Sequence, residues 1–188
     1  RTFRDGLKPY NGEFEKDARY GFYQKDYAPH NNIDSTFLGE AQWKWLEKQF
    51  QKPADIRLIG SGTQFGIEWN GYESWANFPH EQQRMLDLIE ATKASGIIFL
   101  SGDVHYSEIS KLDTSFYPIY DFTSSGLSST WYFATPNKNR IEGPIMDNHF
   151  GLLTIDWNKD DPKIKMETWD INENQRIELS INLSDISF

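Results

Sequence analysis

The sequence has 188 residues, with 15% aromatic and 25% charged residues, 13 glycines and 8 prolines. This length suits about one domain with a core of its own, and this composition excludes collagen-like, low-complexity and disordered chains. The formal net charge of −9 removes the attraction on which general nucleic-acid binding depends, so we expect no nucleic-acid-binding surface. The mean hydropathy is −0.68 and no apolar run is long enough for a membrane helix, so no membrane segment is expected. The absence of cysteine excludes disulfides, thiolate metal sites and cysteine nucleophiles.

The first part of the chain predicts loops around one helix and one strand. Polar residues and turn signals predict mostly loop for residues 1–37. Apolar residues at helical spacing predict a helix over residues 39–51, with Thr36 as its N-cap. Residues 56–59 predict a short buried strand, and an aromatic-rich loop follows over residues 63–78.

A second helix and a second strand follow this loop. Pro79 is favoured in the first turn of a helix, and Gly96 is typical of a helix end. The apolar run over residues 97–100 predicts a buried strand, so residues 39–103 have the order of an α/β fold with a parallel sheet. Five later segments have strand character: residues 109–112, 117–123, 150–157, 164–169 and 176–183. We expect these segments to add antiparallel strands that finish the same sheet.

The sharpest local feature follows the strand at residues 97–100. Ser101-Gly102 leads into Asp103, and His105 comes two residues later. Ligands bind beyond the carboxyl ends of strands in open α/β sheets, and a turn there can point both side chains into one crevice. Carboxylates and imidazoles are ligands of divalent and trivalent metals, and bound metal would attract an anionic substrate to this acidic chain. The alternative is a turn in which Asp103 is a cap and His105 its hydrogen-bond partner, because Asp-x-His is a short motif.

Other polar residues have less specific interpretations. Glu73 and Trp75, in the aromatic loop, are candidates to line a substrate pocket, with core packing as the alternative for Trp75. Glu108 is expected to anchor local structure rather than to act as an acid or base. His149 precedes a strand, and we expect a structural or surface role for it. No serine nucleophile is indicated, so no catalytic side chain is assigned.

Several motifs occur in an order that resembles the PhoD-like alkaline phosphatases and phosphodiesterases of the calcineurin-like metallophosphoesterase superfamily. They are DSTFLGEAQWKWL from residue 34, ESW from 73, PHEQQR from 79, IFLSGDVHYSEI from 98, FTSSGL from 122 and NHFGL from 148. The resemblance implies a four-layer α/β/β/α sandwich and the metal-dependent hydrolysis of phosphate mono- or diesters by a metal-bound water. It also implies iron and calcium as the metals, Asp103 and His105 among their ligands, and an extracytoplasmic enzyme, periplasmic or secreted.

The resemblance covers only part of such a domain, because the motifs that supply metal ligands from its first half do not occur in this sequence. Residues 1–188 are therefore expected to be the C-terminal part of a single metallophosphoesterase domain. The expected partners are the upstream N-terminal half of the same enzyme and a phosphate ester substrate. Two alternatives stay open: a carbohydrate-binding module built on the aromatic loops, and an inactive homologue that keeps only the scaffold.

Overall fold

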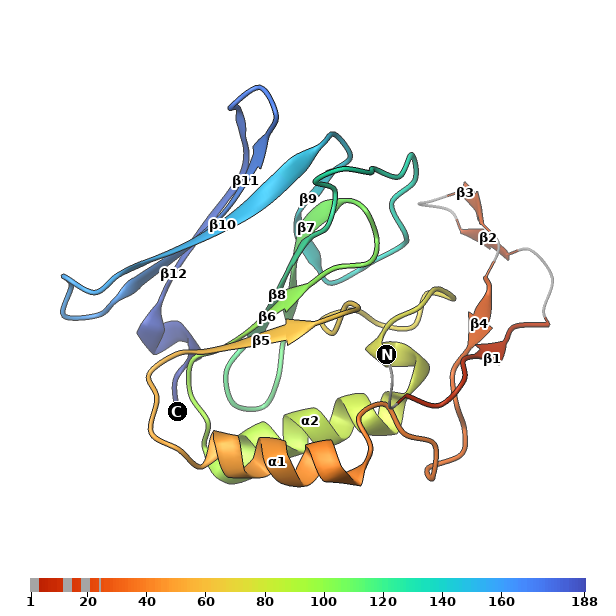
Figure 1. Cartoon of the computed structure of the whole chain (residues 1–188), viewed down its shortest axis with the longest axis horizontal. Coiled ribbons are helices and arrows are strands. Elements are labelled where there is room, and N and C mark those ends of the chain that lie inside the picture. Colours follow the sequence, from red (N-terminus) through yellow and green to blue (C-terminus); the bar gives the residue numbers. More distant parts are fainter. Residues whose placement is uncertain (1–3, 12–14, 18–20, 24) are drawn as a thin grey trace.

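The computed structural model describes residues 4–11, 15–17, 21–23 and 25–188. Its centre is a five-stranded mixed sheet with the strand order β5-β6-β8-β7-β9 (Figure 1). The strands are β5 (Arg57–Ser61), β6 (Ile97–Ser101), β7 (Ser107–Leu112), β8 (Ile119–Ser124) and β9 (Arg140–Ile145). β5, β6 and β8 run parallel, whereas β7 pairs antiparallel with both β8 and β9. The parallel pairing expected for the first two strands is therefore confirmed.

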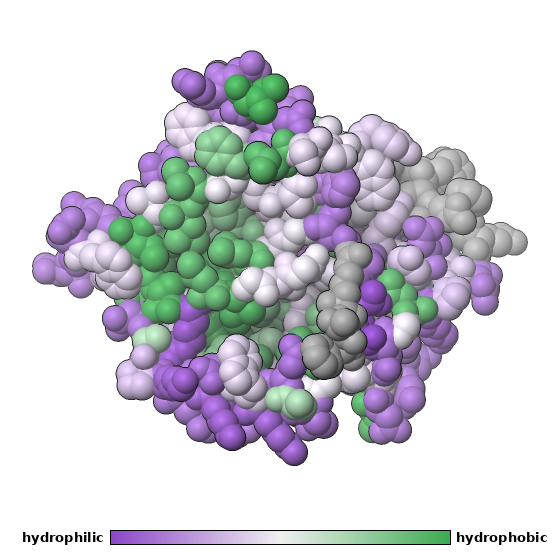
Figure 2. Space-filling model, in the orientation of Figure 1, coloured by the Kyte–Doolittle hydropathy of each residue, from purple (hydrophilic) through white to green (hydrophobic). Residues whose placement is uncertain are grey.

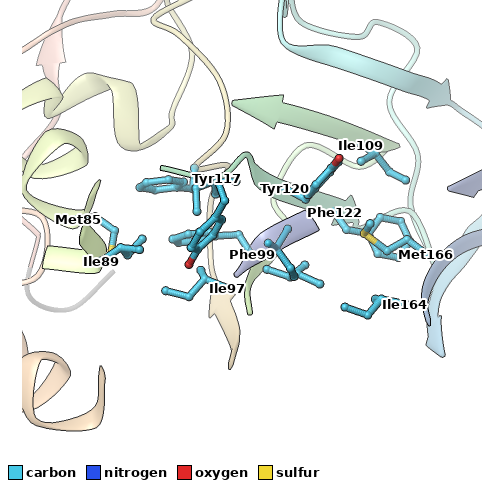
Figure 3. Close-up of a cluster of buried hydrophobic side chains, with 14 of the residues drawn as sticks. Met85, Ile89, Ile97, Phe99, Ile109, Tyr117, Tyr120, Phe122, Ile164 and Met166 are labelled. Carbon is cyan, nitrogen blue, oxygen red and sulfur yellow. The ribbon is translucent and has the colours of Figure 1, made fainter. Parts of the chain in front are cut away.

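Two helices, α1 (Glu40–Phe50) and α2 (Pro79–Thr92), lie side by side against the central sheet (Figure 1). Both match the helices that the sequence predicts. The side chains that they bury are Trp43, Leu46 and Phe50 in α1, and Met85 and Ile89 in α2 together with Glu81. Met85 and Ile89 face Ile97 and Phe99 of β6 in the core (Figure 3). The spacing of apolar residues along each helix thus decides which side packs on the sheet.

The ends of these helices differ from expectation. Thr36 does not cap α1: its hydroxyl accepts the amide of Gly39 at 2.7 Å, and Gly39 itself is the cap, with a φ of 76°. α2 ends at Lys93, whose left-handed φ of 52° stops the helix, and not at Gly96. Gly96 allows its own backbone to lie close to that of Asp55, because a Cβ at this position would overlap the carbonyl oxygen of Asp55. These residues therefore shape the connections between helices and sheet.

A three-stranded antiparallel sheet packs on the central sheet. It consists of β10 (His149–Asp156), β11 (Lys163–Asp170) and β12 (Gln175–Asn182). Ile164 and Met166 of β11 lie near Phe122 of β8 (Figure 3), and the hydroxyls of Ser107 and Thr168 are hydrogen-bonded between the sheets at 2.7 Å. The expectation that all five later segments finish the first sheet was wrong for these three, whereas β7 and β8 do join it, with β8 parallel to β6. Alternation along a strand shows that one face is buried, but not which sheet the strand joins.

Short elements complete the described part of the chain. They are β1 (Lys8–Pro9), β2 (Glu15–Asp17), β3 (Gly21–Tyr23) and β4 (Tyr27–Ala28), with the 3₁₀ helices η1 (Trp75–Asn77) and η2 (Leu183–Ile186). β1 pairs with β4 and β2 with β3, within the segment expected to be mostly loop. The amides of Asp26 and Tyr27 both donate to the Gly71 carbonyl at 2.9 Å, which ties this segment to the aromatic loop. Within the described residues, no helix has the length and apolar character to cross a membrane.

Candidate functional site

The three parallel strands end together at one edge of the central sheet. Ser61 of β5 lies beside Ser101 of β6, and Ser101 lies beside Thr123 of β8. The turn that follows β6 carries Asp103 and His105. Both predicted ligands therefore leave the sheet at the edge where α/β sheets bind ligands.

The backbone of this turn has an unusual conformation. Asp103 and His105 both adopt the left-handed region, with φ values of 80° and 57°. Non-glycine residues enter this region at a cost in free energy and stay there where surrounding contacts fix them. The amide of His105 donates to the Ser125 hydroxyl at 2.9 Å, and its carbonyl accepts the Trp131 amide at 3.2 Å. Two segments from later in the chain therefore hold the turn in place.

Asp103, His105 and Glu73 line one cavity of about 460 Å³. Its other described lining residues are Tyr27, Tyr72, Val104, Ser129, Thr130, Trp131 and Thr135. Asp103 and His105 are exposed to solvent. The carboxylate of Glu73 is mostly buried and pairs with Arg4, with 3.2 Å between Oε1 and Nη2. The structure thus brings together three of the four site residues that the sequence predicts.

Trp75, the fourth predicted site residue, lies in the core and not in this cavity. Its side chain packs against the rings of Phe37, Trp43 and Phe65, and the residue is 3% exposed. The indole N–H donates to the Ser61 hydroxyl at 3.0 Å. A ring enclosed in this way offers little surface to a substrate. Core packing, the alternative interpretation, therefore describes Trp75 better than substrate binding.

An aromatic wall, formed by Tyr27, Tyr72 and Trp131, borders the cavity. The rings of Tyr72 and Trp131 meet edge to face, with 6.1 Å between their centroids. The ring centroid of Phe133 lies 6.3 Å from that of Tyr72 and 6.5 Å from that of Trp131. The sequence analysis assigned no role to Trp131, although the run Trp131-Tyr132-Phe133 stands out in the sequence. Its place beside His105 depends on the hydrogen bond between their backbones, which no sequence pattern indicates.

A buried ionic network lies next to the site. Glu108 of β7 is 0% exposed and forms an ion pair with Arg140 of β9. Its carboxylate also accepts the side-chain amides of Gln64 at 2.6 Å and Asn137 at 2.7 Å. Such a buried charge requires several partners. The structural role expected for Glu108 agrees with this arrangement.

A second buried carboxylate, that of Asp121 on β8, was not identified from the sequence. It is fully buried and accepts hydrogen bonds from the Phe65 amide at 2.7 Å, the Gly66 amide at 2.8 Å and the Ser101 hydroxyl at 2.6 Å. Burial raises the pKa of Asp121 to about 6. These bonds fasten the loop after β5 to the ends of β6 and β8, where the candidate site begins.

The charge around the cavity constrains what it can bind. None of the described lining residues is Lys or Arg, whereas Asp103 and Glu73 are acidic. Arg4 offsets the charge of Glu73 beside the cavity, and cations bound at Asp103 would further favour an anionic ligand. Asp103 and His105 supply two side chains of the kinds that metals accept. The part of the chain that the structure describes nevertheless contains no group of three or more His, Cys, Asp or Glu side chains arranged to hold a metal ion.

Comparisons with known proteins agree on one family. The family model described as PhoD-like phosphatase matches residues 1–168. Among curated proteins, the chain is similar to "Alkaline phosphatase D" of Bacillus subtilis (strain 168), with 26% identity over 94 residues that cover 45% of this chain and 16% of that protein. Among solved structures, it is similar to "Structure of PhoD" with a TM-score of 0.52 and 17% identity, over 96% of this chain and 40% of that chain. This last likeness shows the mixed α/β fold, and both matches span less than half of the relative's length.

Proposed function

The chain belongs to the PhoD-like phosphatase family, and from this premise we propose that it is part of a hydrolase of phosphate mono- or diesters. The candidate active site is the cavity of Asp103 and His105. One observation supports this proposal above the others: a carboxylate and an imidazole, two residues apart, line one cavity beyond the carboxyl ends of three parallel strands. The family match supports phosphoesterase activity, and the cavity supplies a place for it.

Metal ions are the proposed cofactors. Asp103 and His105 fit as two ligands, because a carboxylate and a neutral imidazole both donate electron pairs to such ions. Two ligands do not complete a site, so the remaining ligands would come from outside the described residues. Bound cations would neutralise the phosphoryl oxygens and lower the pKa of a nearby water. Iron and calcium are the proposed identities, on the strength of the resemblance.

Different side chains of this chain would bind different parts of the ester. The hydroxyls of Ser129 and Thr130 can donate hydrogen bonds to ester oxygens in the cavity. The aromatic wall, with Tyr72 and Trp131, offers ring surface to the organic group of the ester. The substrate role expected for Glu73 becomes indirect in this proposal, because its carboxylate pairs with Arg4 beside the cavity.

An upstream half of the same enzyme is the proposed partner, and residues 1–188 are the proposed C-terminal part of one domain. The two relatives have more than twice the chain length that the matches cover. With this half present, a second helical layer would complete the four-layer α/β/β/α sandwich. Among the described strands, β5 has a hydrogen-bonded neighbour on one side only, so its other edge could pair with an added strand.

An apolar hollow on the surface supports this partner. It has a volume of about 600 Å³ and lies between the ends of β5, β6 and β8 and the start of β10. Leu127, 71% exposed, and Phe150, 48% exposed, line it. Gly60 of β5 lines the hollow too. Leu58, two residues earlier, lies on the same face of the strand and is 48% exposed. Figure 2 shows the apolar surface gathered in this region. Exposed apolar area of this kind is typical of a surface that another part of a protein covers.

An extracytoplasmic location is proposed from the resemblance alone. If the chain were instead a carbohydrate-binding module, it would bind sugars at the aromatic wall without metal. If it were an inactive homologue, it would bind neither sugar nor metal. Titration with oligosaccharides, followed by tryptophan fluorescence, separates these cases. Saturable quenching by a sugar in the presence of a chelator would favour the binding module.

Hydrolysis of p-nitrophenyl phosphate by the chain combined with its upstream half tests the proposed function. Asp103→Asn and His105→Asn are the informative variants, because Asn removes the ligand group and tolerates a positive φ better than most residues. We expect each variant to lose at least about a hundredfold in kcat/KM, because the loss of even an outer-shell partner of a metal ligand costs about 10- to 100-fold. Asp160→Asn, which removes a carboxylate in an exposed turn, is the matched control.

Circular dichroism of each variant shows whether the fold is intact. Unchanged turnover in both Asp103→Asn and His105→Asn would contradict the site assigned here. Equal losses in Asp103→Asn and in Asp160→Asn would show that the lost negative charge alone, and not this turn, governs the rate.

A further inference from the structure

His149 is a buried histidine outside the cavity, at the start of β10, and it is 1% exposed. Its Nε2 accepts the amide hydrogen of Gly126 at 3.1 Å, and its Nδ1 lies 2.7 Å from the carbonyl oxygen of Asp147. An amide N–H can only donate and a carbonyl oxygen can only accept. The imidazole is therefore neutral, with its proton on Nδ1 and a lone pair on Nε2 facing Gly126.

Gly126 is held through both of its backbone polar groups. Its carbonyl oxygen accepts the His149 amide at 3.2 Å and the side-chain amide of Asn148 at 3.2 Å. A Cβ at this position would overlap the imidazole ring of His149, so only glycine allows the ring to lie this close. The segment after β8 is thus fastened to the first residues of β10.

This segment reaches the candidate active site through the preceding residue. The hydroxyl of Ser125 accepts the amide of His105 at 2.9 Å, in the turn where His105 has its left-handed conformation. A continuous series of contacts therefore runs from the imidazole of His149 through Gly126 and Ser125 to the backbone of His105. The series links the second sheet to the predicted metal-ligand turn.

We propose that His149 is a positioning residue, whose neutral imidazole fixes Gly126 so that Ser125 can hold the turn of Asp103 and His105. The relevance of that turn to catalysis rests on the proposed function, but the positioning itself does not. Protonation would place a second N–H opposite the Gly126 amide, and two donors facing each other cannot form a hydrogen bond. Acidification would then break one of the three hydrogen bonds that hold Gly126 and would loosen the attachment of Ser125 to the site turn.

Burial, and not the charged groups around His149, disfavours a protonated ring. Asp147 precedes it, and Asp170 of β11 lies opposite it in the strand pairing. Both carboxylates are paired with Arg176 of β12, at 2.6 Å and 3.0 Å. Burial lowers the pKa of His149, although Asp147 acts in the opposite direction. The neutral form that binds Gly126 is therefore the form expected near neutral pH.

Amide hydrogen exchange of the ¹⁵N-labelled full chain, measured by NMR, tests this positioning role. His149→Phe keeps a ring but removes both side-chain hydrogen bonds, His149→Gln keeps an acceptor near Gly126 and cannot titrate, and Ser125→Ala breaks only the last step. We expect His149→Phe to lower the protection factors of Gly126 and His105 about tenfold, and Ser125→Ala to lower only that of His105, as expected for the loss of one hydrogen bond. The amide of Phe99 in β6 serves as the reference for global stability.

The pH dependence separates positioning from general support of the fold. In the wild type, protection of Gly126 and His105 should fall as the ¹³C signals of the His149 ring titrate, and in His149→Gln this fall should be absent. Unchanged protection of His105 in His149→Phe, or a loss shared equally by Phe99, would overturn the proposal. The phosphatase assay of the chain combined with its upstream half keeps the two proposals apart, because absent hydrolysis together with a passed exchange test contradicts only the proposed function.

Discussion

The hydroxyl of Ser101 donates a 2.6 Å hydrogen bond to the carboxylate of Asp121, joining neighbouring parallel strands just before the candidate site. Asp121 also accepts two backbone amides from the loop after β5, so it fastens that loop to the same place. Burial raises the pKa of Asp121 from an ordinary value of 3.8 to about 6. A raised carboxyl pKa means that the folded chain binds this proton more tightly than the unfolded chain does. Ionisation of Asp121 therefore lowers stability as the pH rises from about 4 to about 6.

The variant Asp121→Asn should remove this pH dependence. Asn keeps an oxygen for the amides of Phe65 and Gly66 and carries no charge, so its contribution does not change with pH. We expect wild-type stability to lose roughly 3 kcal/mol from this group between pH 3 and pH 7 relative to the variant. Urea denaturation at a series of pH values measures the difference. Parallel stability curves for the two proteins would show that Asp121 does not titrate in this range.

Glu81 of α2 is expected to be a large source of stability for the segment before α1. Its buried carboxylate accepts the amide of Phe37 at 2.8 Å and the indole N–H of Trp43 at 2.8 Å. Glu81→Ala would leave these buried donors without an acceptor, which costs about 2–4 kcal/mol in total. Glu81→Gln, which keeps one oxygen, should lose less. The free energy of unfolding in urea gives both values.

The neighbouring Glu40 provides the control for Glu81. It pairs with Arg84 at 2.6 Å on the surface, and an exposed ion pair adds little to stability. Glu40→Ala should therefore leave the urea midpoint nearly unchanged. A Glu81→Ala variant as stable as Glu40→Ala would mean that the donors around Glu81 find other acceptors.

Local patterns predicted the elements whose side chains repeat regularly. The apolar positions of α1 and α2 and the apolar run of β6 agree with the structure, because each depends on residues close in sequence. β9 was missed because Gly143 and Pro144 interrupt any strand pattern. The separate sheet of β10, β11 and β12 was missed because strand pairing is decided by contacts between distant segments.

The residues of the candidate site also include some that a local pattern predicts and some that depend on contacts between distant segments. Asp103 and His105 were found because they follow a recognisable strand within one short motif. Trp131 and Ser125 were not found, since they reach the backbone of His105 from 20 or more residues away, Ser125 through its hydroxyl and Trp131 through its amide. His149 was expected to be structural or on the surface, and the structure places it in the interior, against Gly126. Sequence patterns thus identify chemical groups, whereas the contacts that orient them need the fold.

Trp131 should set how well the site binds the organic part of a phosphate ester. Its ring borders the cavity, and loss of an aromatic contact costs about 1 kcal/mol or more. We expect Trp131→Ala to weaken the binding of phenylphosphonate about fivefold and to leave that of inorganic phosphate unchanged, measured by NMR titration of the labelled chain combined with its upstream half, with calcium present. Tyr132→Ala is the matched control, because Tyr132 is the next residue and is 93% exposed. Equal effects of both variants would exclude a specific role for the aromatic wall.

Acidic substitutions in the apolar hollow should weaken the association of this chain with the upstream half. Leu127→Asp and Phe150→Asp each place a charge where we propose that apolar surface becomes buried, so each should raise the Kd at least about tenfold. Calorimetry with the two halves produced separately measures these constants. Ile171→Asp is the control, since Ile171 is 71% exposed but does not line the hollow. Because an added charge also improves solubility at any exposed position, only a difference between the hollow variants and Ile171→Asp supports the proposed interface. Equal Kd values for the three variants would place the upstream half on another face of the chain.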